Sequence, residues 1–199
     1  MHLRDWLLKT VARELSLVGV DSIDLKQMAS AAGMSLKEVR KLYPDKRSLV
    51  LAVITEINEA HKDFVLQPYP EANTPRDRLI RFISKSLIFC DSNPNPAQVI
   101  VIALMGSDPV IKEHVLQCYE RLFSSLILDD LVSVGIIPKK SLLLVSDLTQ
   151  VLLSLMFLGG CPWLQMDYIS FVYPDKIAIS ALDAMKKRYA MDEFSVPAA

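Results

Sequence analysis

Hydrophobic side chains recur along this chain at the three- and four-residue intervals of a helix. Over residues 2–18 they form one stripe, which predicts an amphipathic helix with that stripe buried. The stripe consists of Leu3, Leu7, Val11, Leu15 and Val18. Polar and apolar residues seldom alternate with the two-residue period of a strand. The pattern therefore predicts an all-α fold.

Prolines, glycines and polar clusters mark where the other helices begin and end. The segment DSNPNP, residues 91–96, carries two prolines, and we predict a loop there. We predict about nine helices, over residues 2–18, 25–32, 35–42, 45–66, 74–90, 97–105, 109–134, 141–158 and 174–189.

Residues 24–48, DLKQMASAAGMSLKEVRKLYPDKRS, have the spacing of a helix-turn-helix. Ala29 lies in the middle of the first short helix, where two closely crossing helices leave no room for a larger side chain. Gly33 follows at the turn, where glycine reaches a positive φ at no steric cost. The residues expected to pack beneath the pair are Met28, Ala32, Met34, Val39 and Leu42. An ordinary αα-hairpin also favours a glycine at its turn, so that alternative stays open at this point.

Both short helices begin with residues that can cap a helix N-terminus. Asp24 can accept a hydrogen bond from the backbone of Gln27, and the Gln27 side chain can accept one in return. Ser35 and Glu38 can form the same reciprocal box at the second helix. These caps favour the helix-turn-helix over the simple hairpin.

The second short helix is predicted to have two faces. Val39 and Leu42 would point inward. Lys37, Arg40 and Lys41 share the outward face, at the spacing i, i+3 and i+4. A basic outward face is what phosphate contact in a DNA major groove requires, although a charged helix face is more often only a solvated surface.

Residues 3–50 resemble the DNA-binding domain of the TetR (tetracycline-repressor) family of transcriptional regulators. The resemblance is carried by a first helix that ends in a glycine, by the segment DLKQMASAAGMS, and by YPDKRSLVLAVI, residues 43–54, at the entry to a long fourth helix. It implies a DNA-binding domain over residues 1–48 and a helical effector-binding and dimerisation domain over residues 49–199. The DNA-binding residues it implies are Asp24, Lys26, Ser35, Lys37, Glu38, Arg40, Lys41 and Lys46.

The chain departs from the family pattern in the second short helix. Lys37 and Glu38 stand where the family usually has glycine and threonine, and Arg40 stands where it usually has a phosphate-binding tyrosine. An arginine can replace that contact, because a guanidinium pairs well with phosphate. A carboxylate near DNA is repelled, so we expect Glu38 to face back and cap the helix, or to pair with Lys41.

Charge is distributed unevenly along the chain. The whole sequence has a formal net charge of −1, but residues 1–50 hold nine Lys and Arg against six Asp and Glu, a net of +3. The remainder therefore carries −4. This division fits a DNA-facing head on an acidic body.

Other signals argue against several classes of protein. The cysteines, Cys90, Cys118 and Cys161, are far apart, which indicates reduced thiols in a cytoplasmic protein without a metal site. No signal peptide is evident, and the apolar run 142–158 contains Asp147 and is short for a membrane span. No catalytic or phosphate-binding motif occurs, so we expect neither enzymatic activity nor a cofactor.

The resemblance implies how the rest of the molecule is used. Helices over 141–158 and 174–189 would pair with those of a second copy in a homodimer, which would bind an operator with inverted repeats. A dimer is also expected because one short recognition helix buries little surface. A small effector would bind in the C-terminal domain and shift the dimer to a conformation that releases the operator, giving a repressor. The low charge of residues 97–106 and 141–163 suggests that this effector is apolar or amphipathic. Candidate lining residues are Phe82, Phe89, Met105, Tyr119, Phe123, Phe157 and Trp163.

A second hypothesis comes from another class of protein. Some proteins of this fold no longer bind DNA and act as hydrophobic-ligand carriers or partner-binding modules. Glu38 and the 51% hydrophobic content favour this alternative.

Overall fold

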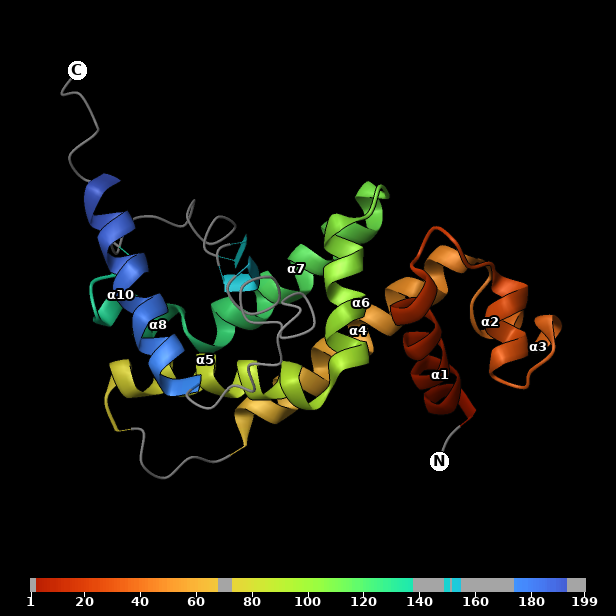
Figure 1. Cartoon of the computed structure of the whole chain (residues 1–199), viewed down its shortest axis with the longest axis horizontal. Helices are drawn as coiled ribbons and strands as arrows, with labels where there is room; N and C mark the ends of the chain where they lie inside the picture. Colours follow the sequence, from red (N-terminus) through yellow and green to blue (C-terminus); the bar gives the residue numbers. More distant parts are fainter. Residues whose placement is uncertain (1–2, 68–72, 138–148, 151, 155–173, 193–199) are drawn as a thin grey trace, which may run out of the picture. The chain divides into compact units, whose positions relative to one another are not determined.

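The structure is a computed structural model that describes residues 3–67, 73–137, 149–150, 152–154 and 174–192. Most of these residues are helical and none is in a strand, which confirms the all-α class. The helices within the described residues are α1 (Leu3–Val18), α2 (Leu25–Ala31), α3 (Leu36–Leu42), α4 (Lys46–Leu66), α5 (Pro75–Ser92), α6 (Pro94–Met105), α7 (Pro109–Leu126), α8 (Leu128–Ser133) and α10 (Pro174–Asp192) (Figure 1).

The chain divides into two compact units. The head unit comprises residues 1–62 and 93–118, and it contains α1, α2, α3, α6, most of α4 and the first part of α7. The body unit comprises residues 63–92 and 119–199, and it contains α5, α8, α10 and the ends of α4 and α7. The functional boundary expected after residue 48 stays a prediction, because compactness does not show which residues contact DNA or a ligand.

The core of the head unit is built around the middle of α1. Leu7, Val11 and Leu15 are fully buried, and α6 packs against this helix. The predicted stripe is wrong at its two ends, because Leu3 is 58% exposed and Val18 is 47% exposed. Both lie in terminal turns of α1, where fewer neighbouring residues are present to cover a side chain.

The turn between α2 and α3 is closed by hydrogen bonds that require glycine. The Met34 N–H donates to the Ala29 carbonyl over 2.9 Å, and the Gly33 N–H donates to the Ser30 carbonyl over 3.0 Å, which together form a Schellman motif. Gly33 has a φ of +68°, as the spacing predicts. Packing beneath the two helices is confirmed for Met28, Ala32, Met34 and Val39, which are all buried.

Both predicted capping boxes are present. At α2, the Gln27 N–H donates to Asp24 Oδ1 over 2.8 Å, and the Asp24 N–H donates to Gln27 Oε1 over 2.7 Å. At α3, the Ser35 N–H donates to Glu38 Oε2 over 2.8 Å, and the Glu38 N–H donates to Ser35 Oγ over 3.2 Å. Each box satisfies backbone donors that have no partner within the helix.

Helix α5 is central to the body unit, because α8 and α10 both pack against it (Figure 1). Leu79 and Ile83 lie four residues apart on the buried face of α5, and Leu182 is buried on α10. At the start of α10, Asp175 Oδ1 accepts a hydrogen bond of 2.6 Å from Ser84 Oγ of α5. The Ser84–Asp175 hydrogen bond therefore joins two helices that also pack against each other.

The predicted loop over residues 91–96 is wrong. Helix α5 continues to Ser92, and α6 begins at Pro94. Proline suits the first turn of a helix, because its φ is already helical and its missing N–H has no intrahelical partner there. The two prolines therefore open a helix.

The single helix predicted over residues 109–134 is two helices, α7 and α8. They are separated at Ile127, whose φ of −129° lies outside the helical range. Just before the break, Ser125 Oγ donates to the Leu122 carbonyl over 2.9 Å, a local bond of the kind that bends helices.

Most of the helix predicted over residues 141–158 lies outside the described residues. Within it, residues 149–150 and 152–153 are helical. Helix α10 begins at Pro174 as predicted. Among the helices that the structure describes, none combines the length and the apolar character needed to cross a membrane.

Substituting Gly33→Ala should lower the free energy of unfolding by about 1–2 kcal/mol, because the new side chain must adopt a positive φ. A Cβ at this position meets no atom within 4 Å, so backbone strain is the whole expected effect. Urea denaturation measures the change. Gly33→Asn is the matched control and should lose less, because asparagine tolerates this conformation. An alanine variant as stable as the wild type would contradict the strain argument.

Substituting Ser35→Ala should lower the free energy of unfolding by about 1 kcal/mol, because the Glu38 N–H loses its side-chain acceptor. Glu38→Gln should cost less, since an amide oxygen can still accept from the Ser35 N–H. Thermal or urea denaturation of the two variants checks this order, and a larger loss in Glu38→Gln would contradict the capping account.

Comparing the wild type with Glu38→Gln also tests a pH dependence. Hydrogen bonds from Ser35 lower the pKa of Glu38 below its ordinary value of 4.5 in the folded state. The ionised carboxylate therefore stabilises the folded state above about pH 4.5, and this contribution is lost as the pH falls through the lower folded-state pKa. As the pH falls from about 4.5 through the folded-state pKa of Glu38, the free energy of unfolding of the wild type should fall relative to that of Glu38→Gln. A difference between the two proteins that stays constant with pH would contradict this prediction.

Candidate nucleic-acid interface and effector pocket

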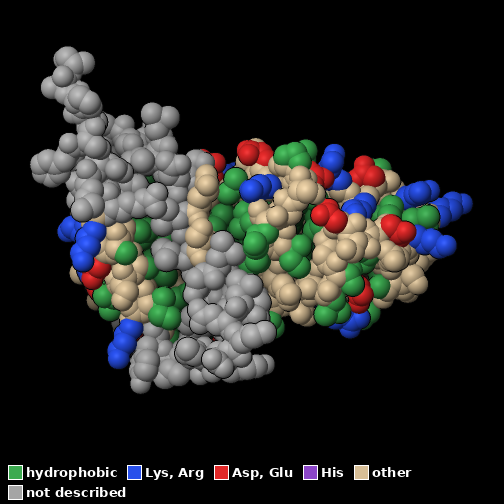
Figure 2. Space-filling model, turned by 45° about the horizontal axis from the view of Figure 1, so that its top comes forward, with side chains coloured by type: hydrophobic (Ala, Val, Ile, Leu, Met, Phe, Trp, Pro, Cys, Tyr) green, Lys and Arg blue, Asp and Glu red, His purple; other side chains and the backbone are tan. Residues whose placement is uncertain are grey.

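Helix α3 presents a cationic face to solvent. Lys37, Arg40 and Lys41 are all exposed, whereas Val39 is completely buried. Figure 2 shows Lys and Arg side chains projecting from the helix-turn-helix end of the head unit, at the right of the view. The residues that anchor α3 and the residues that could contact DNA thus lie on different faces of the helix.

Leu42 does not lie on the buried face of α3. It is 45% exposed, so its predicted inward orientation is wrong. Leu42 is the last residue of α3, and Val39 alone is buried in this helix. A seven-residue helix has only two turns, so one well-packed residue can hold it against α2.

The Glu38 carboxylate is directed at the N-terminus of its own helix. Its Oε2 accepts hydrogen bonds from the Ser35 N–H and from Ser35 Oγ, over 2.8 and 2.6 Å. These bonds lower the pKa of Glu38, and the nearby charge of Lys41 lowers it further by a smaller amount. The acidic residue that departs from the family pattern is therefore engaged in the helix cap, as the first of our two explanations predicts.

Lys46 is the first residue of α4, as the resemblance implies. Its ammonium donates to the Asp21 carbonyl over 3.4 Å, which places it against the α1–α2 connection. The α4 N-terminus is capped separately, because the Ser48 N–H donates to Asp45 Oδ1 over 2.7 Å. Lys46 therefore has no capping role and lies partly exposed beside the helix-turn-helix.

The other predicted DNA contacts fall into two groups. Asp24 and Ser35 are exposed at helix starts, where both act as caps. Lys26 is exposed in the first turn of α2. The structure thus places all eight predicted residues on α2, on α3 and at their flanks, and their contacts with DNA stay a prediction.

Two arginines of the head unit have partners that the sequence did not suggest. Arg4 Nε donates to Tyr43 Oη over 3.1 Å, which raises the pKa of Arg4 and ties α1 to the end of α3. Arg47 forms an ion pair with Asp108, with Nη2 and Oδ2 separated by 2.8 Å. Both pairs join residues about forty or more positions apart, so no local sequence pattern could reveal them.

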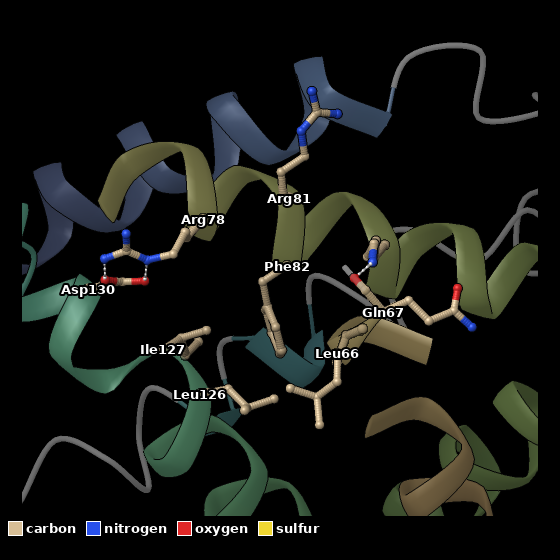
Figure 3. Close-up of a pocket in the computed structure, with 10 residues that line it drawn as sticks. Leu66, Gln67, Arg78, Arg81, Phe82, Leu126, Ile127 and Asp130 are labelled. Carbon is tan, nitrogen blue, oxygen red and sulfur yellow. Dashed lines mark hydrogen bonds and ion pairs between the residues drawn. The ribbon is translucent and has the colours of Figure 1, made fainter. Parts of the chain in front are cut away.

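The body unit contains a cavity of about 270 Å³ beside α5 (Figure 3). In the close-up, Phe82 points from α5 toward Leu66, Leu126 and Ile127. The cavity is lined by Val65, Leu66, Gln67, Arg78, Arg81, Phe82, Lys85, Leu126, Ile127 and Asp130. Its wall is therefore apolar on one side and carries three cations and one carboxylate on the other.

Of the predicted effector residues that the structure describes, only Phe82 lines this cavity. Phe123 stacks edge-on against it with ring centroids 5.7 Å apart, and Tyr119 contacts Phe123 at the same separation, so these two back the cavity wall. Phe89 packs instead against Phe64, with centroids 5.7 Å apart.

Met105 does not line this cavity. Met105 belongs to the head unit and is the last residue of α6. It is 73% exposed, because an apolar side chain in the last turn of a helix is not necessarily covered by neighbouring residues. Phe157 and Trp163 lie outside the described residues.

The cations of the cavity were not predicted. Arg78 Nε and Nη2 donate to the two oxygens of Asp130, a bidentate pair that raises the pKa of Arg78. Lys85 Nζ donates to the Gln67 carbonyl. The spacing of Arg78, Arg81 and Lys85 on one helix face was the available signal. In the described part of the chain, no group of three or more His, Cys, Asp or Glu residues could hold a metal ion.

No family model matches the sequence, and a search of curated protein sequences found no match either. Solved structures do match. A protein from Rhodococcus sp. assigned to the TetR family of transcriptional regulators is 17% identical with a TM-score of 0.71, over 92% of this chain and 98% of that one. The fatty acid degradation regulator FadR from Bacillus halodurans is 13% identical with a TM-score of 0.69, over 92% and 97%.

A TetR-family transcriptional regulator from Streptomyces coelicolor is 18% identical with a TM-score of 0.63, over 96% of this chain and 89% of that one. At such identities the similarity concerns the fold, and it extends well beyond the residues 3–50 on which the resemblance rested. The chain therefore has the fold of the TetR-family transcriptional regulators.

Proposed function

We propose that this protein is a sequence-specific DNA-binding transcriptional regulator. The observation that carries the proposal is the arrangement of charge on α3. Lys37, Arg40 and Lys41 are exposed, while Glu38, the one carboxylate of that helix, is held at the N-terminus by Ser35. The exposed face is therefore positively charged, as contact with DNA phosphates requires.

Residues outside α3 support the same proposal. Lys26 lies in the first turn of α2 and Lys46 at the start of α4, so phosphate contacts could extend to either side of α3, the recognition helix. The Arg4–Tyr43 hydrogen bond ties the end of α3 to α1, and the two capping boxes stabilise the N-termini of α2 and α3. A fixed recognition helix binds with a smaller loss of conformational entropy than a mobile one.

We further propose that the protein binds an inverted-repeat operator as a homodimer. One seven-residue helix buries too little surface for specific binding, so two half-sites are needed. Helix α10 is our proposed dimerisation helix. Its Ile177 is 39% exposed in the single chain, and a partner helix could cover it.

A small effector bound in the body unit would cause release of the operator. The protein would then act as a repressor in the absence of the effector. The cavity beside α5 supports a site there, and α4 contributes residues to both units. An effector that binds one conformation more tightly than another shifts the dimer toward that conformation. DNA affinity falls if the favoured conformation spaces the two heads wrongly for the half-sites.

Replacing Arg40 or Lys41 by alanine should weaken binding to an operator by about tenfold or less, and should reduce the slope of log affinity against log salt by about one for each phosphate that is no longer neutralised. Fluorescence anisotropy with duplexes from upstream of the chain's own gene measures both quantities. Lys112→Ala, an exposed lysine on α7, is the matched control and should change neither. If no upstream duplex binds with sequence preference, the hydrophobic-carrier alternative replaces this proposal.

Glu38→Gln separates the cap from the charge in the same assay. It retains an acceptor for the Ser35 N–H and removes a negative charge near the cationic face. We expect unchanged or slightly tighter operator binding. A marked loss of affinity would show that the carboxylate itself contacts DNA, for example by accepting from a cytosine amino group.

A further inference from the structure

Glu38 limits the ways in which α3 can face DNA. Its carboxylate is exposed and is held at the start of the helix by two hydrogen bonds from Ser35. These bonds lower the pKa of Glu38 below its ordinary value of 4.5, so the carboxylate is ionised at neutral pH. A fixed negative charge is repelled by phosphates, whereas the edges of base pairs carry no net charge. The first turn of α3 therefore fits over base pairs better than against the DNA backbone.

The cations of α3 are divided between its two turns. Lys37 is the second residue of the helix, whereas Arg40 and Lys41 lie in the last turn. The helix has seven residues and is about 10 Å long, so one turn can lie deep in a groove while the other stays near the phosphates. In helix-turn-helix proteins the N-terminal residues of the recognition helix contact the base edges. By this rule Lys37 is the cation of α3 that lies closest to the bases.

The burial of Val39 shows which side of α3 faces outward. Val39 is fully buried, and successive helical residues are rotated by about 100°. Lys37 therefore points about 160° away from Val39, at the centre of the exposed face, and Arg40 points about 100° away, toward one edge of that face. Lys41 shares the central direction but lies one turn later. Position along the helix and direction around it together single out Lys37 as the cation that can reach the floor of a groove.

A lysine on the floor of the major groove discriminates between bases. Its ammonium has three N–H donors and no acceptor. Guanine presents two adjacent acceptors, N7 and O6, in the major groove. Adenine presents its N7 acceptor beside an amino donor, cytosine presents an amino donor, and thymine presents one acceptor beside a methyl group. Guanine is therefore the base that gives one ammonium two hydrogen bonds.

We propose that Lys37 is a specificity-determining residue that reads a guanine in each operator half-site, by donating from Nζ to guanine N7 and O6. Arg40 and Lys41 contact the phosphates beside that base, and the Glu38 carboxylate lies over the groove, away from the phosphates. This inference rests on the proposed function, because it names a base of the operator that such a regulator binds.

Selection of bound duplexes by the intact wild-type chain provides the first test. The library carries about 30 randomised base pairs, enough for two half-sites about one DNA turn apart. The wild type should enrich an inverted repeat with a guanine at one fixed position of each half-site. Replacing both of these guanines by 7-deazaguanine removes the N7 acceptor and keeps the base pairing. Binding should then weaken about tenfold or more, as measured by fluorescence anisotropy.

Variants of Lys37 assign the reading to this side chain. Lys37→Met should lose the preference for guanine over adenine at that position, expected to be about tenfold in the wild type, and should be insensitive to 7-deazaguanine. Lys37→Arg should keep the preference, because a guanidinium also donates to N7 and O6. Measurement in low salt strengthens the phosphate contacts, so the weaker variant still binds.

Lys41→Met is the matched control, since it removes an ammonium from the same exposed face one turn later. It should weaken all duplexes by a similar factor and retain the guanine preference, as expected for a phosphate contact. Circular dichroism melting curves check that each variant is folded.

A wild-type motif without a fixed guanine would overturn the inference and leave DNA binding in place. So would a motif in which every guanine preference survives in Lys37→Met. If the wild type enriches no motif, the proposed function fails and the inference fails with it. The two failures are thus distinguished by whether the wild type selects a sequence at all.

Discussion

The capping box between Ser35 and Glu38 is the interaction on which the cationic face of α3 depends. A carboxylate in the first turn of a helix is stabilised by the N–H groups and the dipole of that terminus, and there it also compensates the charge of that helix end. Were Glu38 extended into solvent, it would lie one turn or less from Arg40 and Lys41 and reduce their attraction for phosphate. The capping box stabilises the N-terminus of α3 and keeps the Glu38 charge at that end of the helix. The same contact therefore contributes to the stability of α3 and to the positive charge of its exposed face.

The features of the head that could be predicted from sequence all act over a few residues. The two capping boxes, the positive φ of Gly33 and the burial of Val39 each follow from residues within one or two turns. Burial at helix ends was not predictable in this way. Leu3 and Leu42 have the right chemistry and spacing for a core, but whether a terminal side chain is covered depends on neighbours supplied by the fold.

The lining of the body cavity could not be predicted from local sequence patterns alone. Phe82 was predicted as a lining residue from its chemistry, and Met105 was chosen by the same argument but is exposed. The Arg78–Asp130 pair joins residues 52 positions apart, and it exists only because α8 packs against α5. The cationic stripe of α5 was visible in the sequence as charges at helical spacing. That these charges line a cavity depends on the apolar residues opposite, which come from several separate segments of the chain.

The two cationic surfaces of this chain differ in burial, and burial decides what each can recognise. The α3 cations are solvated, so their charges carry little desolvation cost, and they attract a polyanion collectively. Salt weakens this attraction over a screening length of about 8–10 Å. Lys85 is partly desolvated, so its charge is costlier to keep and its attraction for one anion is screened less by salt. A surface of the first kind suits a long charged backbone and depends on the number of contacts. The second kind depends on the position of a single ammonium, so salt should weaken its interactions less than it weakens the collective attraction of the α3 cations.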